Sequence, residues 1–202
     1  MIVIDFEINY AINRQGGQYG IYKNILLYNF ADNHDVARVA TQLKEPRHLP
    51  LVYALLYAMP GIPSIYYGSE FGLQAEKRKD TDANLRPALD LAELHPETSE
   101  LFAFLCKLGK AYEEHPALHT GSFFTVEVRN QQLVFRRGEG DTALYCLLNL
   151  ADTPADLPLP ITGDGWENLL TGESVAATGR YAAPAFSAAW IAKATTGTET
   201  QI

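Results

Sequence analysis

The sequence predicts an α/β segment followed by an all-β segment, and three observations indicate this order. An apolar run that turns abruptly polar at 32–35 is expected to be a strand at 25–30, buried on both faces. An almost wholly apolar helix at 49–59 and a second apolar run at 62–67 complete a strand–helix–strand unit. From Gly121 onward the apolar pattern changes to a period of two with frequent turns, which indicates an antiparallel sandwich.

The α/β segment is expected to begin with a helix at 5–14. Ile4, Ile8, Ala11 and Ile12 then lie on one face, and Asp5 caps the start. The further elements follow in chain order: a strand at 25–30, a partial helix at 36–43, a buried helix at 49–59, a parallel strand at 62–67, a long polar loop at 69–95 and a helix at 97–114. Long loops of this kind are usually functional or mobile.

The all-β segment shows five candidate strands separated by turn signals. They lie at 123–128, 132–137, 143–150, 166–170 and 186–191. Trp166, Phe186 and Trp190 are expected to be buried in or against this sandwich. The polar end of the chain, 195–202, is expected to be a disordered tail.

Composition narrows the functional classes. The net charge is −8 and no basic cluster stands out, so no nucleic acid and no anionic membrane is expected as a partner. Cys106 and Cys146 have no metal-ligand spacing, and they are expected to be buried free thiols in a reducing, cytoplasmic location. The start of the chain shows no signal-peptide pattern, and no apolar run is long enough to span a membrane.

A polar turn, Asp32-Asn33-His34-Asp35, follows the first expected strand. In parallel α/β proteins, ligands bind and chemistry takes place at the carboxyl ends of the strands. A polar turn that caps the next helix explains the same residues equally well. Composition alone therefore leaves a binding site and a helix cap as equal alternatives.

The residues around this turn resemble a motif of a known family. Phe30-Ala31-Asp32-Asn33-His34-Asp35 is similar to the Phe-x-x-Asn-His-Asp motif of the α-amylase family of glycoside hydrolases, family 13. The resemblance continues from Leu49 to Leu73 and includes Met59-Pro60-Gly61-Ile62-Pro63 and Tyr66-Tyr67-Gly68-Ser69-Glu70. The resemblance is to members of the type that acts on maltodextrin or cyclomaltodextrin.

The resemblance implies the last βα units of a (β/α)₈ TIM-type barrel, present only in part, followed by a C-terminal antiparallel β-sandwich. The expected domains are a partial catalytic barrel at 1–118, a β-sandwich at 119–194 and the tail at 195–202. A complete barrel needs about 250 residues. In this family the Asn-His-Asp motif follows the seventh strand, whereas only 24 residues precede the corresponding strand in this sequence.

The parent chemistry needs residues that this sequence does not show. A retaining glycosidase uses a carboxylate nucleophile and a carboxylic acid. In the α-amylase family the nucleophile lies in a Gly-x-Arg-x-Asp motif, which is absent from these 202 residues. Asp5 and Glu7 lie on an expected helix rather than at a strand end, so neither is expected to be catalytic.

By resemblance, Asp35 is the third carboxylate of the family and stabilises the transition state; capping the next helix is the alternative. His34 would donate a hydrogen bond to the same sugar, or serve only the structure. Asp82 and Arg86 match an Asp-x-x-x-Arg pattern, so that Arg86 would hold a distal sugar or merely form a loop salt bridge. Asn33 is expected to brace the turn, and Arg38 to pair with a loop carboxylate. No metal and no cofactor is expected.

Two functions fit this sequence. One is the C-terminal piece of an enzyme that hydrolyses or transfers α-glucosidic bonds in maltodextrin-type glucans and is inactive alone. The other is a non-catalytic sugar-binding or assembly module. The expected partners are an α-glucan oligosaccharide and, because strand edges are left open, a second copy or an N-terminal barrel fragment.

Overall fold

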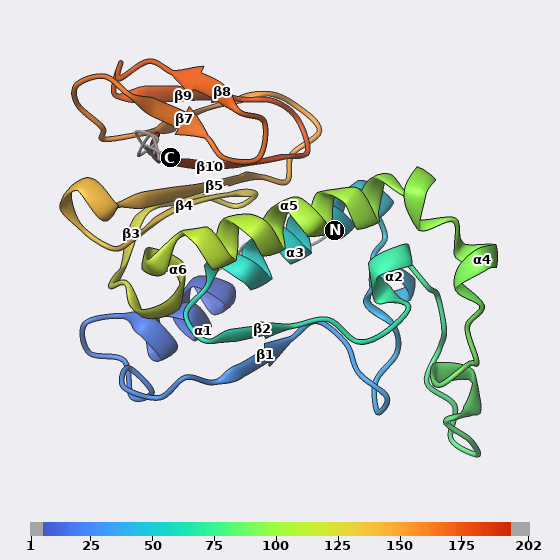
Figure 1. Cartoon of the computed structure of the whole chain (residues 1–202). Helices are drawn as coiled ribbons and strands as arrows, with labels where there is room; N and C mark the ends of the chain where they lie inside the picture. The colour runs from blue at the N-terminus through green and yellow to red at the C-terminus, as the bar shows by residue number, and fades with distance from the viewer. Residues whose placement is uncertain (1–5, 195–202) are drawn as a thin grey trace, which may run out of the picture.

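The computed structural model describes residues 6–194, with side chains from residue 9 onward. An α/β layer lies below an all-β layer in Figure 1. The cap expected from Asp5, the packing of Ile4 and the disordered tail expected at 195–202 lie outside the described residues. The expected order of an α/β segment before a β-sandwich is confirmed.

The α/β layer contains a parallel pair of short strands. Tyr28 of β1 (Tyr28–Phe30) lies opposite Ile62 of β2 (Ile62–Ser64), and the connection between the strands includes α3 (Leu49–Ala58). This confirms the strand–helix–strand unit. The other helices are α1 (Phe6–Gly16), α2 (Val39–Gln42), α4 (Leu91–Leu94), α5 (Glu100–Glu114) and α6 (Pro116–Thr120), with 3₁₀ turns at Pro46–His48, Ser69–Phe71, Ala83–Leu85 and Pro96–Thr98.

The expectation that 25–30 is a strand buried on both faces is wrong. Ile25 and Leu26 precede β1, and the side chain of each is 58% exposed. Tyr28, within β1, is 66% exposed. The physical reason is that β2 is the only strand paired with β1 in the described chain. A two-stranded sheet leaves an open edge on each side, so apolar residues that would be covered in a larger sheet face the solvent.

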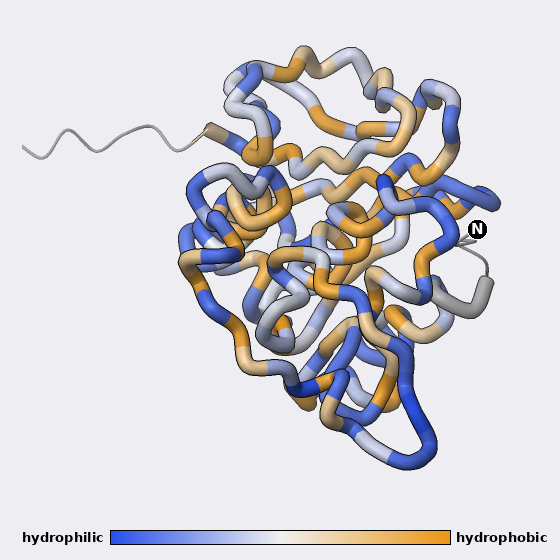
Figure 2. The backbone as a smooth tube through the Cα atoms, turned by 90° about the vertical axis from the view of Figure 1, so that its right-hand side faces the viewer, coloured by the Kyte–Doolittle hydropathy of each residue, from blue (hydrophilic) through white to orange (hydrophobic). Residues whose placement is uncertain are grey.

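Two helices support the strand pair. The buried residues of α3 are Leu51, Tyr53, Ala54, Leu56 and Ala58, in agreement with the apolar pattern. Helix α5 begins at Glu100 rather than at 97, because the hydroxyl of Ser99 caps it by accepting from Phe102 N at 3.2 Å. The long loop expected at 69–95 contains only short helical turns, and its charged residues colour the lower part of Figure 2 blue.

The all-β layer is a six-stranded sheet facing a two-stranded one. The strand order is β3-β4-β5-β10-β7-β8 in the larger sheet and β6-β9 in the smaller, and every pair in this layer is antiparallel. The strands are β3 (Phe123–Val128), β4 (Gln132–Arg137), β5 (Leu144–Asn149), β6 (Ala155–Pro158), β7 (Trp166–Asn168), β8 (Glu173–Val175), β9 (Arg180–Ala183) and β10 (Ser187–Lys193), with a 3₁₀ turn at Gly140–Thr142. The sequence missed β6, β8 and β9, which have too few alternating apolar residues to stand out.

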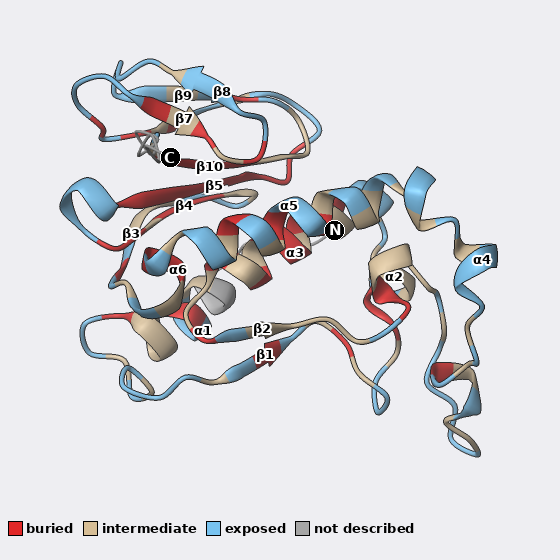
Figure 3. Cartoon of the chain, in the orientation of Figure 1, coloured by how far each residue is buried: buried red, intermediate tan, exposed pale blue. Residues whose placement is uncertain are grey.

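One hydrophobic core joins the two layers. Leu133, Phe135 and Trp190 from the larger sheet pack in the same cluster as Leu56 of α3 and Leu108 of α5. Figure 3 shows the buried residues of β5, β10 and these helices between the layers. A second cluster fills the space between the two sheets. The boundary expected near residue 118 falls inside α6, so the chain does not pass between the layers through an exposed linker.

Trp166 and Trp190 are buried, as expected, whereas Phe186 is only half-buried. The ring of Phe186 lies 3.9 Å from the guanidinium of Arg47. Both cysteines are free, but Cys106 is exposed and only Cys146 is buried. Within residues 6–194, no helix has the length and apolar character needed to cross a lipid bilayer.

Replacing Trp190 by alanine is expected to lower the free energy of unfolding by about 3–5 kcal/mol, because the change leaves a large cavity in the shared core. Trp190 is 1% exposed. Phe124→Ala on the same sheet is the matched control: Phe124 is 58% exposed, so its loss should cost less than about 1 kcal/mol. Urea unfolding of both variants measures the difference, and equal losses would contradict a core shared by the two layers.

Candidate functional site

The carboxyl ends of β1 and β2 meet at one edge of the molecule, and the polar turn 32–35 lies there. Asn33 Oδ1 accepts a hydrogen bond from Asp35 N at 2.8 Å and so fixes the turn. The His34 and Asp35 side chains are 47% and 64% exposed, with Nε2 of the histidine 3.2 Å from Oδ2 of the carboxylate. These two groups therefore face the solvent and are free to contact a ligand.

Asp32, in contrast, is buried and belongs to the interior. Its Oδ2 accepts from Val39 N at 2.8 Å, and both of its carboxylate oxygens lie within 2.9 Å of Ser69 Oγ. The sequence predicts no separate role for Asp32 and none for Ser69. A carboxylate directly after a strand was the available signal for the first, whereas nothing in the sequence pairs the second with it.

Arg38 is fully buried beside them. Its Nη1 donates to Tyr67 O at 2.8 Å and to Ser69 Oγ at 2.9 Å, and its Nη2 donates to Leu85 O at 2.7 Å. The prediction that Arg38 pairs with a loop carboxylate is therefore wrong, because its side chain donates directly to two backbone carbonyls and one hydroxyl. Arg38 and Asp32 both hydrogen-bond to the Ser69 hydroxyl, which lies between the two charged groups.

Two tyrosines line the inner side of this edge. The guanidinium of Arg38 lies 4.2 Å from the ring of Tyr66, which in turn lies 6.1 Å from the imidazole of His34. Tyr53 Oη donates to Ser69 O at 3.2 Å, and burial raises the pKa of Tyr53 far above its usual value. Tyr53 therefore stays a neutral hydrogen-bond donor beneath the site.

The loop after β2 brings Asp82 and Arg86 to the same edge. The Asp82 carboxylate pairs with Lys77 and lies 3.9 Å from Nη2 of Arg86. The hydrogen bond from Lys77 lowers the pKa of Asp82, and the positive charge of Arg86 acts in the same direction. All six residues predicted from the sequence thus lie in the segments around the ends of β1 and β2, although their roles differ.

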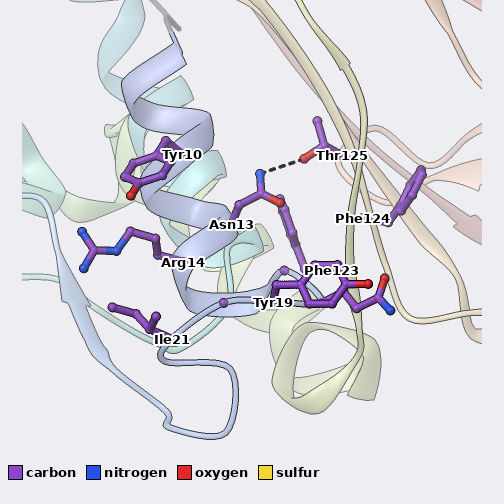
Figure 4. Close-up of a pocket in the computed structure, with 11 residues that line it drawn as sticks. Tyr10, Asn13, Arg14, Tyr19, Ile21, Phe123, Phe124 and Thr125 are labelled. Atoms are coloured by element: carbon purple, nitrogen blue, oxygen red, sulfur yellow. Dashed lines mark hydrogen bonds between the residues drawn. The ribbon is translucent and has the colours of Figure 1, made fainter.

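A cavity of about 750 Å³ lies elsewhere, between α1 and β3 (Figure 4). Tyr10, Arg14, Tyr19 and Phe124 are among its lining residues, and none of the six residues predicted from the sequence lines it. No three His, Cys, Asp or Glu side chains gather into a metal-binding group within the part of the chain that the structure describes.

Two protein families match different parts of this chain. Residues 7–100 match the family described as "Alpha amylase, catalytic domain", and residues 121–190 match a "Domain of unknown function (DUF3459)". A cyclomaltodextrinase from Bacillus sp is 27% identical over 146 residues, covering 71% of this chain and 25% of that protein. A 4-alpha-glucanotransferase from Thermotoga neapolitana is 38% identical over 69 residues, covering 32% of this chain and 15% of that protein.

Solved structures show the same fold. The maltogenic amylase from S.marinus has a TM-score of 0.71 and 25% identity, covering 93% of this chain and 25% of that one. An alpha-amylase from Anoxybacillus has a TM-score of 0.70 and 22% identity, covering 96% of this chain and 47% of that one. The chain spans about a quarter of the length of the first two curated relatives. The expected family resemblance and fold class are confirmed.

Proposed function

We propose that this chain is the C-terminal portion of an α-amylase-family glycoside hydrolase and supplies one edge of an α-glucan site to a barrel that an N-terminal partner completes. The observation that carries this proposal is the pair of solvent-facing groups, His34 and Asp35, where the parallel strands β1 and β2 end. The names of two relatives, cyclomaltodextrinase and cyclomaltodextrin glucanotransferase, support a maltodextrin-type substrate for this site.

In this proposal Asp35 accepts hydrogen bonds from ring hydroxyls beside the scissile bond and favours the positively charged transition state. His34 donates to the same sugar and Arg86 holds a distal one, with Asp82 orienting that guanidinium at 3.9 Å. Asn33 and Arg38 hold the loops rather than the sugar, because their bonds are to the chain itself. The two free cysteines support a reducing, cytoplasmic location.

The partner would supply the nucleophile and the acid. Retaining hydrolysis needs two carboxyl groups about 5–5.5 Å apart on either side of the bond that breaks. Asp32 is buried beside Ser69, and Asp82 is held by Lys77, so neither is placed to attack a sugar. Hydrolysis and transfer both fit this division, since the acceptor of the glycosyl group would bind within the completed cleft.

The open edge of β1 is where the partner would dock. Exposed apolar side chains precede this strand or lie within it: Ile21, Ile25, Leu26, Tyr28 and Phe30. Unpaired strand edges and large apolar patches are the surfaces on which other chains assemble. We therefore assign this surface, named here the β1 edge, to the N-terminal barrel fragment, or to a second copy when that fragment is absent.

The purified chain is expected to form dimers or larger oligomers, and an equimolar N-terminal fragment should convert them to a one-to-one complex. Placing a charge on the β1 edge, as in Leu26→Glu, should weaken either association about tenfold or more. Leu91→Glu is the matched control, because Leu91 is 65% exposed on α4 in another part of the chain. Light scattering that shows a compact monomer in both conditions would contradict this assignment.

Turnover of maltodextrin on mixing the chain with the N-terminal fragment tests the function itself. The mixture should release reducing sugar at a rate that saturates with the concentration of this chain, since each complex needs one copy. The N-terminal fragment alone is the control. A mixture that binds maltodextrin without turning it over would instead favour the second function, a sugar-binding module.

A further inference from the structure

We propose that Asp32, Ser69 and Arg38 act as positioning residues that hold His34 and Asp35 in place. This inference rests on the proposed function and concerns how its site is built. The three residues, named here the buried lock, are 2%, 1% and 0% exposed. Asp32 precedes the solvent-facing pair in the chain and Arg38 follows it, while Ser69 hydrogen-bonds to both.

The serine hydroxyl joins the other two residues of the buried lock. A hydroxyl has one proton to donate and lone pairs to accept with. Ser69 Oγ accepts from Arg38 Nη1 at 2.9 Å and donates to the Asp32 carboxylate, whose nearer oxygen lies at 2.8 Å. Without the hydroxyl, the buried carboxylate and the buried guanidinium would lose the group that joins them, and a buried charge without a partner is strongly destabilising.

The lock fixes the loop that carries the sugar-facing pair. The carboxylate of Asp32 accepts from Val39 N at 2.8 Å, which closes residues 32–39 into one loop around His34 and Asp35. Because this bond joins the first and last residues of the loop, its loss would remove the contact that closes the loop. Bonds within the turn, such as the one from Asp35 N to Asn33, would remain.

Arg38 ties two further segments to this loop. Its side chain donates to Tyr67 O after β2 and to Leu85 O, which directly precedes Arg86, while its backbone N–H donates to Ala75 O at 2.9 Å. The fork of a guanidinium reaches carbonyls in two directions at once, whereas a lysine ammonium is a single point on a flexible stem. One buried cation thus sets the spacing between His34, Asp35 and Arg86.

Amide hydrogen exchange on the full chain tests the lock without any catalysis. Ser69→Ala and Arg38→Lys should speed exchange at the Val39 and Arg38 amides by about tenfold or more. The exchange rates of the amides in strand β10 should not change. Arg137→Lys is the matched control, because Arg137 is also buried and donates to two carbonyls, Ala58 O at 2.7 Å and Gly121 O at 3.2 Å. Faster exchange at Val39 in the control, or none in the lock variants, would overturn the proposal.

Kinetics of the mixture with the N-terminal fragment separate positioning from mere stability. Ser69→Ala should lower kcat about 10- to 100-fold, since a misplaced catalytic group loses this much, and Ser69→Thr should restore most of it by keeping the hydroxyl. Arg137→Lys should leave kcat within about twofold. An unchanged kcat in Ser69→Ala would overturn the positioning role. If the unaltered mixture has no turnover, the proposed function fails, whereas the exchange result still decides whether the lock holds the loop.

Discussion

The purified 202-residue chain is expected to release no reducing sugar from maltodextrin, starch or cyclodextrin above the rate without protein. A group that stabilises a transition state improves chemistry that other groups carry out, and it does not replace them. In this chain Asp35 has a solvent-facing carboxylate, whereas the carboxylates of Asp32 and Asp82 are held by other contacts.

Each of those neighbours has a physical reason not to attack a sugar. Asp32 is held in the interior by Ser69 and by Val39 N. Asp82 is paired with Lys77, which lowers its pKa and makes it a poor proton donor. Glu70 lines a cavity together with Phe102 and Leu105, on the side of the chain that faces α5.

A reducing-sugar assay on the chain alone measures this, with the N-terminal fragment and the mixture run in parallel. A contaminating amylase would keep its rate in a preparation of Asp35→Asn, so that variant serves as the control. Turnover by the chain alone that disappears in Asp35→Asn would show that a nucleophile and an acid lie within these residues, contrary to the assignment made here.

Much of the fold could be predicted because its signals are local. The apolar residues of α3 and the turn residues between β3 and β4 each lie within a few residues of the element that they define. The short strands β6 and β8 could not be predicted, since they are stabilised by pairing with β9 and β7 rather than by an alternating pattern of their own.

In the candidate site, too, local features could be predicted from the sequence and contacts between distant residues could not. The turn that carries His34 and Asp35 is contiguous in the sequence, so its motif could be read directly. The bond between Ser69 and Asp32 joins residues far apart in the chain, and the contacts of Arg38 depend on carbonyls that no side-chain pattern reports. The exposure of β1 could not be predicted either, because burial depends on strands that pair with it and not on its own apolar residues.

In the mixture with the N-terminal fragment, Asp35→Asn is expected to lower kcat by about 10²–10³-fold, as loss of one group aimed at developing charge commonly does. Asparagine keeps the size of the side chain and removes its negative charge, so the oxocarbenium-like transition state loses its electrostatic partner while ground-state contacts persist. KM should therefore change much less than kcat.

Stability separates this effect from misfolding. The side chain of Asp35 is 64% exposed, so Asp35→Asn should leave the free energy of unfolding within about 0.5 kcal/mol. Asp141→Asn is the matched control, because Asp141 is exposed in the 3₁₀ turn Gly140–Thr142 of the β-sandwich and should leave kcat unchanged. Initial rates over a range of maltodextrin concentrations give kcat and KM for both variants. If Asp35→Asn retains the full kcat of the mixture, Asp35 is not the carboxylate that favours the transition state.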